Sequence, residues 1–203
     1  MSTLGLVVVP WGEPGMPVSG SGTLLGGMSL LDRAVAALTS CPDVDHVLVV
    51  APGEPPLDAA HAGADVVVLH DASFPLVDAA VVGAVLRALQ VDPRAAAAVA
   101  VLPVTDTLKQ VAPDGAVLAT VDRAGLRVAG SPQAYRTDLL PAGVAAPFLF
   151  ASTLPPDPPD AAALPRALVE AGRRVVLVDA PPAAFRVRTD VDLLAARALF
   201  GEA

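Results

Sequence analysis

The 203-residue chain lacks isoleucine and asparagine and has one lysine, Lys109, and one cysteine, Cys41. A single cysteine excludes an internal disulfide and a zinc site built on several cysteine thiolates. Charged residues make up 17% of the chain and hydrophobic residues 54%, which excludes a disordered chain and predicts a buried core. We interpret the dominance of alanine, valine, proline, glycine and arginine as the coding bias of a GC-rich genome.

Apolar runs long enough to cross a membrane are also missing. The longest, Ala95–Val104, falls short of the ~20 residues that a spanning helix needs, and Pro103 interrupts it. The net charge of −8 comes with no basic patch, which argues against a nucleic-acid partner. No charged segment precedes the short apolar run Leu4–Val9, so we expect no secretory signal and predict a cytoplasmic location.

Short apolar runs alternate along the chain with segments of helical spacing. This alternation predicts an α/β fold with a mostly parallel sheet and helices on both faces, in one domain spanning residues 1–203. The predicted strands are Leu4–Val9, Val47–Ala51, Val66–Leu69, Ala98–Leu102 and Arg174–Val178, with a short strand near Phe185–Val187. The predicted helices are Met28–Leu38 with Ser29 as its cap, Val77–Leu89, a helix around Thr137–Leu140, Ala161–Ala171, and Val191–Phe200 opened by Thr189 or Asp190.

Residues 104–131 interrupt this alternation. Asp114–Gly115 is a strong hairpin signal between Thr107–Val111 and Val117–Val121. A third short extended piece, Leu126–Val128, follows the hairpin. We therefore predict a β-arm over about 104–131 that projects from the α/β body.

Ligands of parallel sheets bind beyond the carboxyl ends of the strands, so polar residues there are candidates for chemistry. Asp71 ends the third predicted strand, where it either holds a divalent cation on a phosphate or caps the helix that follows. His70 would face the other side of that strand, where a packed histidine is favoured over a ligand.

Two further segments carry candidate phosphate-binding groups. Pro10–Gly27 is rich in glycine, whose backbone amides can approach phosphates, but it lacks the Walker and dinucleotide patterns, so a surface loop is favoured over a phosphate-binding loop. Thr105–Lys109 follows a strand end, and Arg123, Ser131 and Arg186 lie near other predicted strand ends. Together such groups suit a phosphate monoester, although singly each is typical of a solvated surface. No Gly-x-Ser-x-Gly elbow is present, so we set nucleophilic catalysis aside.

Four motifs, in order, resemble those of the 2-C-methyl-D-erythritol 4-phosphate cytidylyltransferase family. Val68–Ala72 resembles the strand-end motif His-Asp-Ala-Ala-Arg-Pro, and Val101–Lys109 resembles Pro-Val-x-Asp-Thr-Ile-Lys. Thr120–Leu126 followed by Ser131–Tyr135 resembles Asp-Arg-x-x-Leu and Thr-Pro-Gln-x-Phe, and Ala184–Leu193 resembles the closing Lys-Ile-Thr-Thr-x-x-Asp-Leu.

The resemblance implies a Rossmann-like nucleotidyltransferase sheet and an enzyme of isoprenoid biosynthesis by the non-mevalonate pathway. Such enzymes join a cytidine phosphate from CTP to a sugar-alcohol phosphate and release pyrophosphate. The resemblance further implies Mg²⁺ held near Asp71 and a homodimer in which Arg123 reaches the site from the arm of the neighbouring subunit. Carried over by motif, Asp71, Arg123 and Arg186 are catalytic; Thr107, Ser131, Lys109 and Asp106 bind the sugar phosphate; and Pro10, Trp11 and Gly12 bind the nucleotide.

The chain departs from the family pattern at the nucleotide end. The first loop has Glu13 and Gly20, and no cation, where the family has an arginine and a lysine. Phe74 replaces the arginine of the His-Asp motif, whereas Arg186 in place of lysine fits the coding bias. The alternative is therefore a catalytically impaired or inactive relative that binds a sugar phosphate or acts as a regulatory homodimer.

Overall fold

The computed structural model describes residues 1–8, 24–50, 63–140 and 163–201. Its centre is a six-stranded sheet in the order β10-β6-β9-β5-β1-β4. The strands of this sheet are β1 (Thr3–Val8), β4 (His46–Val50), β5 (Val66–Asp71), β6 (Ala95–Pro103), β9 (Arg127–Arg136) and β10 (Arg174–Asp179). Pairs β1–β4, β1–β5 and β6–β10 are parallel, whereas β9 runs antiparallel to both of its neighbours. The mostly parallel sheet predicted from the sequence is confirmed.

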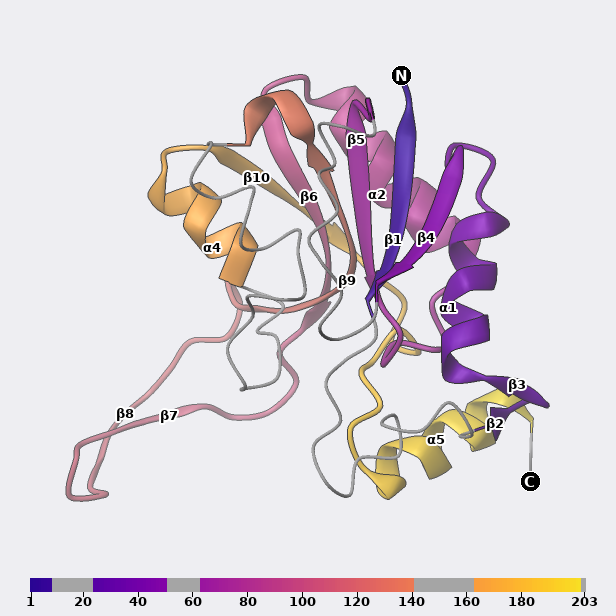
Figure 1. Cartoon of the computed structure of the whole chain (residues 1–203). Helices are drawn as coiled ribbons and strands as arrows, with labels where there is room; N and C mark the ends of the chain where they lie inside the picture. The colour runs from indigo at the N-terminus through magenta and orange to yellow at the C-terminus, as the bar shows by residue number, and fades with distance from the viewer. Residues whose placement is uncertain (9–23, 51–62, 141–162, 202–203) are drawn as a thin grey trace.

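Helices cover both faces of this sheet (Figure 1). Helices α1 (Leu30–Thr39) and α2 (Ala79–Val91) pack on one face over buried valines and alanines of β5 and β6. Helix α4 (Ala163–Glu170) covers the other face, where Leu164 and Leu168 pack against Ala96, Ala97 and Tyr135. The Ser29 side chain accepts a hydrogen bond from the Asp32 amide and begins α1, as predicted.

Strand β9 was missed as part of the central sheet. The sequence indicated only a short piece at Leu126–Val128, but the strand continues for ten residues to Arg136 and separates β5 from β6. Pro132 lies within it, and proline argues against a central strand because it has no amide hydrogen to donate. The buried Gln133 side chain donates to the Gly130 carbonyl at 2.7 Å and so satisfies an acceptor where the pairing with β6 shifts register.

The hairpin β7 (Lys109–Val111) and β8 (Val117–Thr120) projects away from the sheet (Figure 1). Gly115 has a φ of +86°, which suits glycine at the predicted turn. Val111, Val117 and Leu118 are more than half exposed on this hairpin. The hairpin confirms the predicted projecting β-arm, but the arm is shorter than the predicted 104–131, because residues 127–131 belong to β9 of the central sheet.

The C-terminal region runs from β10 to helix α5 (Asp190–Phe200). The prediction of a strand near Phe185–Val187 is wrong, because this segment makes no strand pairing in the described structure. The Val187 amide instead donates to the Ser73 carbonyl at 2.7 Å. The helix expected around Thr137–Leu140 is a single 3-10 turn, Thr137–Leu139. No helix among the described residues is both long and apolar enough to cross a membrane.

Helix α5 begins with a reciprocal cap just after the segment that carries Arg186. The Thr189 hydroxyl accepts from the Asp192 amide at 3.2 Å, and the Asp192 carboxylate accepts from the Thr189 amide at 2.8 Å. We expect Thr189→Ala to lower the free energy of unfolding by about 1 kcal/mol, because the Asp192 amide loses its side-chain acceptor. Urea unfolding measures this, with Thr189→Ser as the control that keeps the hydroxyl. An unchanged urea midpoint in the alanine variant would contradict the assignment of Thr189 as the cap of α5.

Candidate active site

The carboxyl end of β5 places Asp71 beside the carboxyl end of β1. Asp71 pairs with Val8, the last residue of β1, and Ala72 donates from its amide to the Val8 carbonyl at 3.1 Å. The position predicted for Asp71, at the end of the third long parallel strand, is therefore confirmed. Its side chain is about one-fifth exposed, so it is within reach of a ligand.

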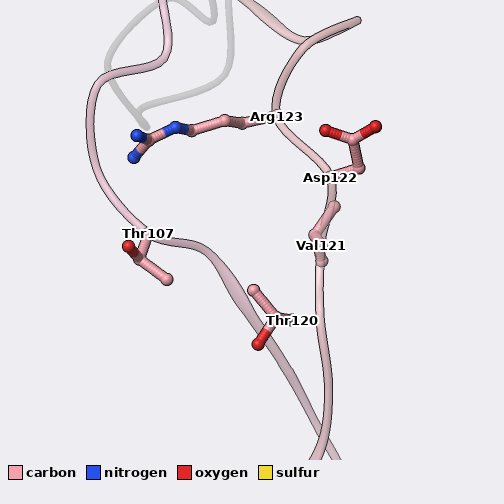
Figure 2. Close-up of a pocket in the computed structure, with 5 residues that line it drawn as sticks. All are labelled: Thr107, Thr120, Val121, Asp122 and Arg123. Carbon is pink, nitrogen blue, oxygen red and sulfur yellow. The ribbon is translucent and has the colours of Figure 1, made fainter.

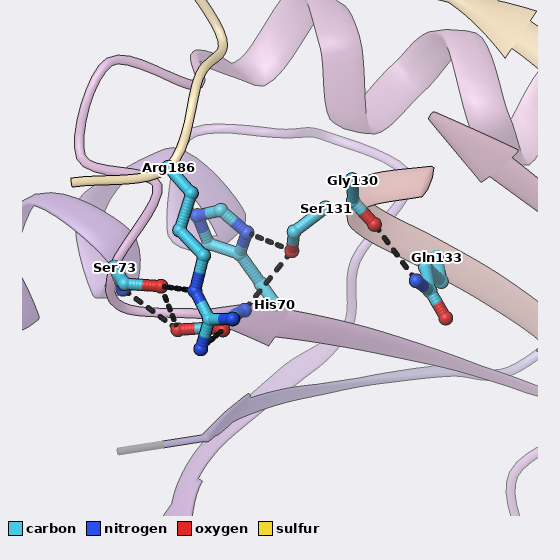
Figure 3. A network of polar contacts seen from close by, with 7 residues as sticks. His70, Ser73, Gly130, Ser131, Gln133 and Arg186 are labelled. Carbon is cyan, nitrogen blue, oxygen red and sulfur yellow. Dashed lines mark hydrogen bonds and ion pairs between the residues drawn. The ribbon is translucent and has the colours of Figure 1, made fainter. Parts of the chain in front are cut away.

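Asp71, Ser73 and Arg186 form a connected polar cluster (Figure 3). One carboxylate oxygen of Asp71, Oδ1, accepts from the Ser73 amide at 2.7 Å and from the Ser73 hydroxyl at 2.6 Å. The other oxygen, Oδ2, lies 3.2 Å from Nη2 of Arg186. Nε of Arg186 donates to the Ser73 hydroxyl at 2.9 Å. Ser73 thus holds the carboxylate and the guanidinium in one arrangement.

These contacts bear on the two roles predicted for Asp71, which were ligand of a divalent cation and cap of the helix that follows. Asp71 accepts from the amide two residues later, which is a local turn, whereas the cap of α2 is Asp78, whose carboxylate accepts from the Ala80 and Val81 amides. Oδ2 of Asp71 faces only the Arg186 guanidinium among the contacts of the described residues. Asp71 is therefore not the cap of the helix, and it keeps one oxygen opposite a cation.

Ser131 lies on the buried side of this cluster, on β9. Its hydroxyl oxygen accepts from the Asp71 amide at 3.0 Å and lies 2.8 Å from Nδ1 of His70. His70 is completely buried, and burial lowers the pKa of its imidazole to about 4, so the ring is neutral at pH 7. The expectation that His70 packs inside the protein agrees with this position.

The arm carries a second group of the predicted residues (Figure 2). A pocket of about 300 Å³ is lined by Thr107, Thr120, Val121, Asp122 and Arg123. One guanidinium nitrogen of Arg123 donates to the Thr105 carbonyl, and the exposed Lys109 ammonium donates to the Thr120 hydroxyl at 2.6 Å. Asp106 is exposed on the same arm.

The structure therefore divides the predicted site residues into two groups. Asp71, Ser131 and Arg186 gather at the end of β5, while Thr107, Lys109, Asp106 and Arg123 belong to the arm. Among the described residues, no hydrogen bond or ion pair links the two groups. The predicted nucleotide-binding residues Pro10, Trp11 and Gly12 lie outside the described residues, as does most of the first loop.

Sequence reasoning missed Ser73 as a member of the site. The available signal was its spacing, because an aspartate followed two residues later by serine is typical of a local turn in which the carboxylate accepts from the chain ahead. Phe74, which replaces a family arginine, is buried in the core and approaches Gly130, where an added Cβ would lie 3.5 Å from its ring. Phe74 therefore contributes packing at the position where the family has a cation.

Comparisons with known proteins give one consistent result. The family model described as 2-C-methyl-D-erythritol 4-phosphate cytidylyltransferase matches residues 54–202. The cytidylyltransferase of that name from Rhodococcus jostii is 33% identical over 88% of this chain and 85% of its own length. A bifunctional enzyme IspD/IspF from Anaeromyxobacter is 34% identical over 86% of this chain, which spans about half (51%) of that protein.

Solved structures agree with this assignment. The 2-C-methyl-D-erythritol 4-phosphate cytidylyltransferase from Thermus thermophilus superposes with a TM-score of 0.67 at 28% identity and covers 96% of both chains. The 4-diphosphocytidyl-2C-methyl-D-erythritol synthase from Anaerococcus prevotii, at 17% identity, shares the fold with a TM-score of 0.73 over 98% of both chains. The nucleotidyltransferase-like α/β fold and the matched motifs lead to the same conclusion: this chain belongs to the 2-C-methyl-D-erythritol 4-phosphate cytidylyltransferase family.

Proposed function

We propose that this protein transfers a cytidylyl group from CTP to 2-C-methyl-D-erythritol 4-phosphate and releases pyrophosphate. The observation that carries the proposal is the Asp71–Arg186 pair, held by Ser73 at the carboxyl end of β5. In parallel sheets this edge is where ligands bind. Membership of the family supplies the reaction class, and the matched motifs bring these residues to that edge.

The reaction is an in-line displacement at phosphorus. An oxygen of the acceptor's phosphate forms a bond to the α-phosphorus of CTP, the bond from that phosphorus to the bridging oxygen breaks, and pyrophosphate leaves with the electron pair. A phosphate monoester is largely dianionic at pH 7, so no residue must remove a proton from the nucleophile. What the protein must supply is positioning and neutralisation of negative charge.

Arg186 suits the second task, because a guanidinium presents fixed donors that match phosphate oxygens. Without substrate its charge is balanced by Asp71 at 3.2 Å, and Nη2 makes no aligned hydrogen bond to any of the described residues. An arriving phosphate offers Arg186 a stronger partner and frees Oδ2 of Asp71. Ser73 keeps both side chains at the site during this exchange, because it bonds to each of them.

Asp71 also fits the Mg²⁺ that the family implies. Magnesium is usually held by one or two carboxylates together with substrate phosphates and waters, so a single carboxylate with one available oxygen is a suitable donor set. The described residues contain no cluster of three or more metal-binding side chains. When bound there, Mg²⁺ would neutralise charge on the triphosphate.

The arm completes the site in the proposed homodimer. Thr107 and Arg123 line a pocket on the arm that projects from the body, and Lys109 and Asp106 are exposed on the same arm. These groups would bind the sugar phosphate held by the neighbouring subunit. The exposed apolar side chains of the hairpin support burial against a partner. A nucleotide contact at Pro10, Trp11 and Gly12 stays a prediction, because these residues lie outside the described structure. The cytoplasmic location stays a prediction.

Pyrophosphate release tests the proposal. With 2-C-methyl-D-erythritol 4-phosphate and Mg²⁺, we expect release from CTP and much less from ATP, GTP or UTP. Omitting the sugar phosphate should stop the reaction, which separates transfer from nucleotide hydrolysis. Release no greater than with heat-killed protein for all four nucleotides would overturn the proposal. If calorimetry then showed sugar-phosphate binding without turnover, the result would favour the alternative of a catalytically inactive relative that binds a sugar phosphate. The first-loop residues that suggest this alternative lie outside the described residues.

A further inference from the structure

We propose that His70 is a positioning residue for the reaction: through the Ser131 hydroxyl, it fixes the main chain at Asp71. This inference rests on the proposed function, because it assigns to Asp71 the role given above. His70 and Asp71 are neighbours on β5, and alternation along the strand places their side chains on opposite faces. His70 therefore acts from behind the site and does not touch the substrate.

The contact that carries the inference is a three-membered chain of hydrogen bonds (Figure 3). Nδ1 of His70 lies 2.8 Å from the Ser131 hydroxyl oxygen, and that oxygen accepts from the Asp71 amide at 3.0 Å. Either tautomer of a neutral imidazole can make the contact with Ser131, because a hydroxyl both donates and accepts. Ser131 comes from β9, sixty residues away in the sequence, so the chain joins two strands at the site.

Ser131 replaces a missing backbone bond at this point of the sheet. Pairing between β5 and β9 ends at Leu69 and Gln133, two residues before Asp71. Ser131 lies two residues before Gln133 in β9, beyond the last residue pair of this ladder. The Asp71 amide would lack an acceptor on this side, and the Ser131 hydroxyl provides one. The end of β5 is thus held by side chains where the regular ladder stops.

Packing alone does not explain a histidine at position 70, because its burial leaves one ring nitrogen without a hydrogen-bond partner among the described residues. Nε2 is buried and makes no hydrogen bond within the described residues. An apolar side chain would fill the same space without leaving that atom unsatisfied. The compensating gain is the Nδ1 contact that orients Ser131, and through it Asp71. Small displacements of a reacting group lower the rate strongly, so this orientation is valuable to the reaction.

Variants of His70 and Ser131 separate positioning from packing. We expect His70→Leu to lower kcat by about 10–100-fold, with little change in KM for either substrate. This is the usual effect of removing a group that orients another residue of the site without touching the ligand itself. His70→Asn offers an amide near the position of Nδ1 and should recover most of the lost kcat. Ser131→Ala should match His70→Leu, and the double variant should lose no more than either alone, because both act through one contact.

Val67→Ala is the matched control. Val67 is fully buried on the same strand and touches neither Asp71 nor Ser131 by a hydrogen bond. It should lower the free energy of unfolding and leave kcat at the wild-type value. Wild-type kcat in His70→Leu, or failure of Asn to perform better than Leu, would overturn the positioning role. Independent, additive losses in the double variant would overturn it as well.

Hydrogen exchange at the Asp71 amide probes its hydrogen bond to Ser131 directly and does not depend on enzyme activity. In wild-type protein this amide should be protected, and it should exchange at least about tenfold faster in Ser131→Ala and His70→Leu, while the Val68 amide stays unchanged. Unchanged Asp71 exchange in both variants would overturn the inference. If wild-type protein released no pyrophosphate, the proposed function would fail, and the exchange data would still decide whether His70 fixes Asp71.

Discussion

Replacing Asp71 with asparagine is expected to lower kcat for pyrophosphate release by about 10³-fold, the scale on which a lost charge-stabilising group slows a polar reaction. Asparagine has nearly the same shape and keeps an oxygen that can accept from Ser73. It loses the negative charge that faces Arg186 across 3.2 Å and that would hold Mg²⁺. Steady-state assays at saturating CTP and sugar phosphate measure the effect.

Asp78→Asn is the matched control for this substitution. Asp78 lies seven residues further along and caps α2 by accepting from the Ala80 and Val81 amides. Asparagine is an equally good cap, so both stability and kcat should stay close to wild type. An Asp71→Asn enzyme with near wild-type kcat would remove Asp71 from the reaction and with it the proposed role of the cluster.

Mixing two inactive variants is expected to restore activity if the arm acts across the dimer. Arg123→Ala should lower kcat by about 100-fold, because a cation near the substrate is lost. When Arg123→Ala and Asp71→Asn subunits are mixed and allowed to exchange, half of the dimers are mixed. Each mixed dimer has one site with Asp71 from one subunit and Arg123 from the other, so activity should return to about a quarter of the wild-type value.

The pairing of Asp71→Asn with Arg186→Gln provides the control for this experiment. Asp71 and Arg186 are in contact within one chain, so every site in the mixed dimer lacks one of them. No recovery is therefore expected for this pair. Native mass spectrometry verifies subunit exchange. If exchange occurs and the Arg123 mixture also stays inactive, the arm does not act across a dimer.

Local patterns made much of the fold predictable. Val66–Leu69 is a continuous apolar run, which predicts a strand buried on both faces, and Asp71 then falls at the strand end where ligands bind. Ser29 and Thr189 were recognisable as helix caps because their side chains accept from amides a few residues ahead. The Asp114–Gly115 signal correctly located the hairpin of the arm.

What the sequence could not show depends on contacts between distant segments. Strand β9 contains Gly130 and Pro132, which argue locally against a strand, and only pairing with both β5 and β6 makes it one. The partnership of His70 with Ser131 spans sixty-one residues, and that of Ser73 with Arg186 spans 113. No local spacing encodes such pairs, so the members of the site could be named while most of their contacts could not.

The most direct test of the central claim, cytidylyl transfer at the Asp71–Arg186 cluster, is ³¹P NMR of CTP and 2-C-methyl-D-erythritol 4-phosphate incubated with the protein and Mg²⁺. The account predicts that the phosphate monoester signal is replaced by the two coupled signals of a diphosphate diester, with one pyrophosphate formed for each product, and that Asp71→Asn slows the change by about 10³-fold. Unaltered monoester and CTP signals with wild-type protein at substrate-level concentration would contradict the account.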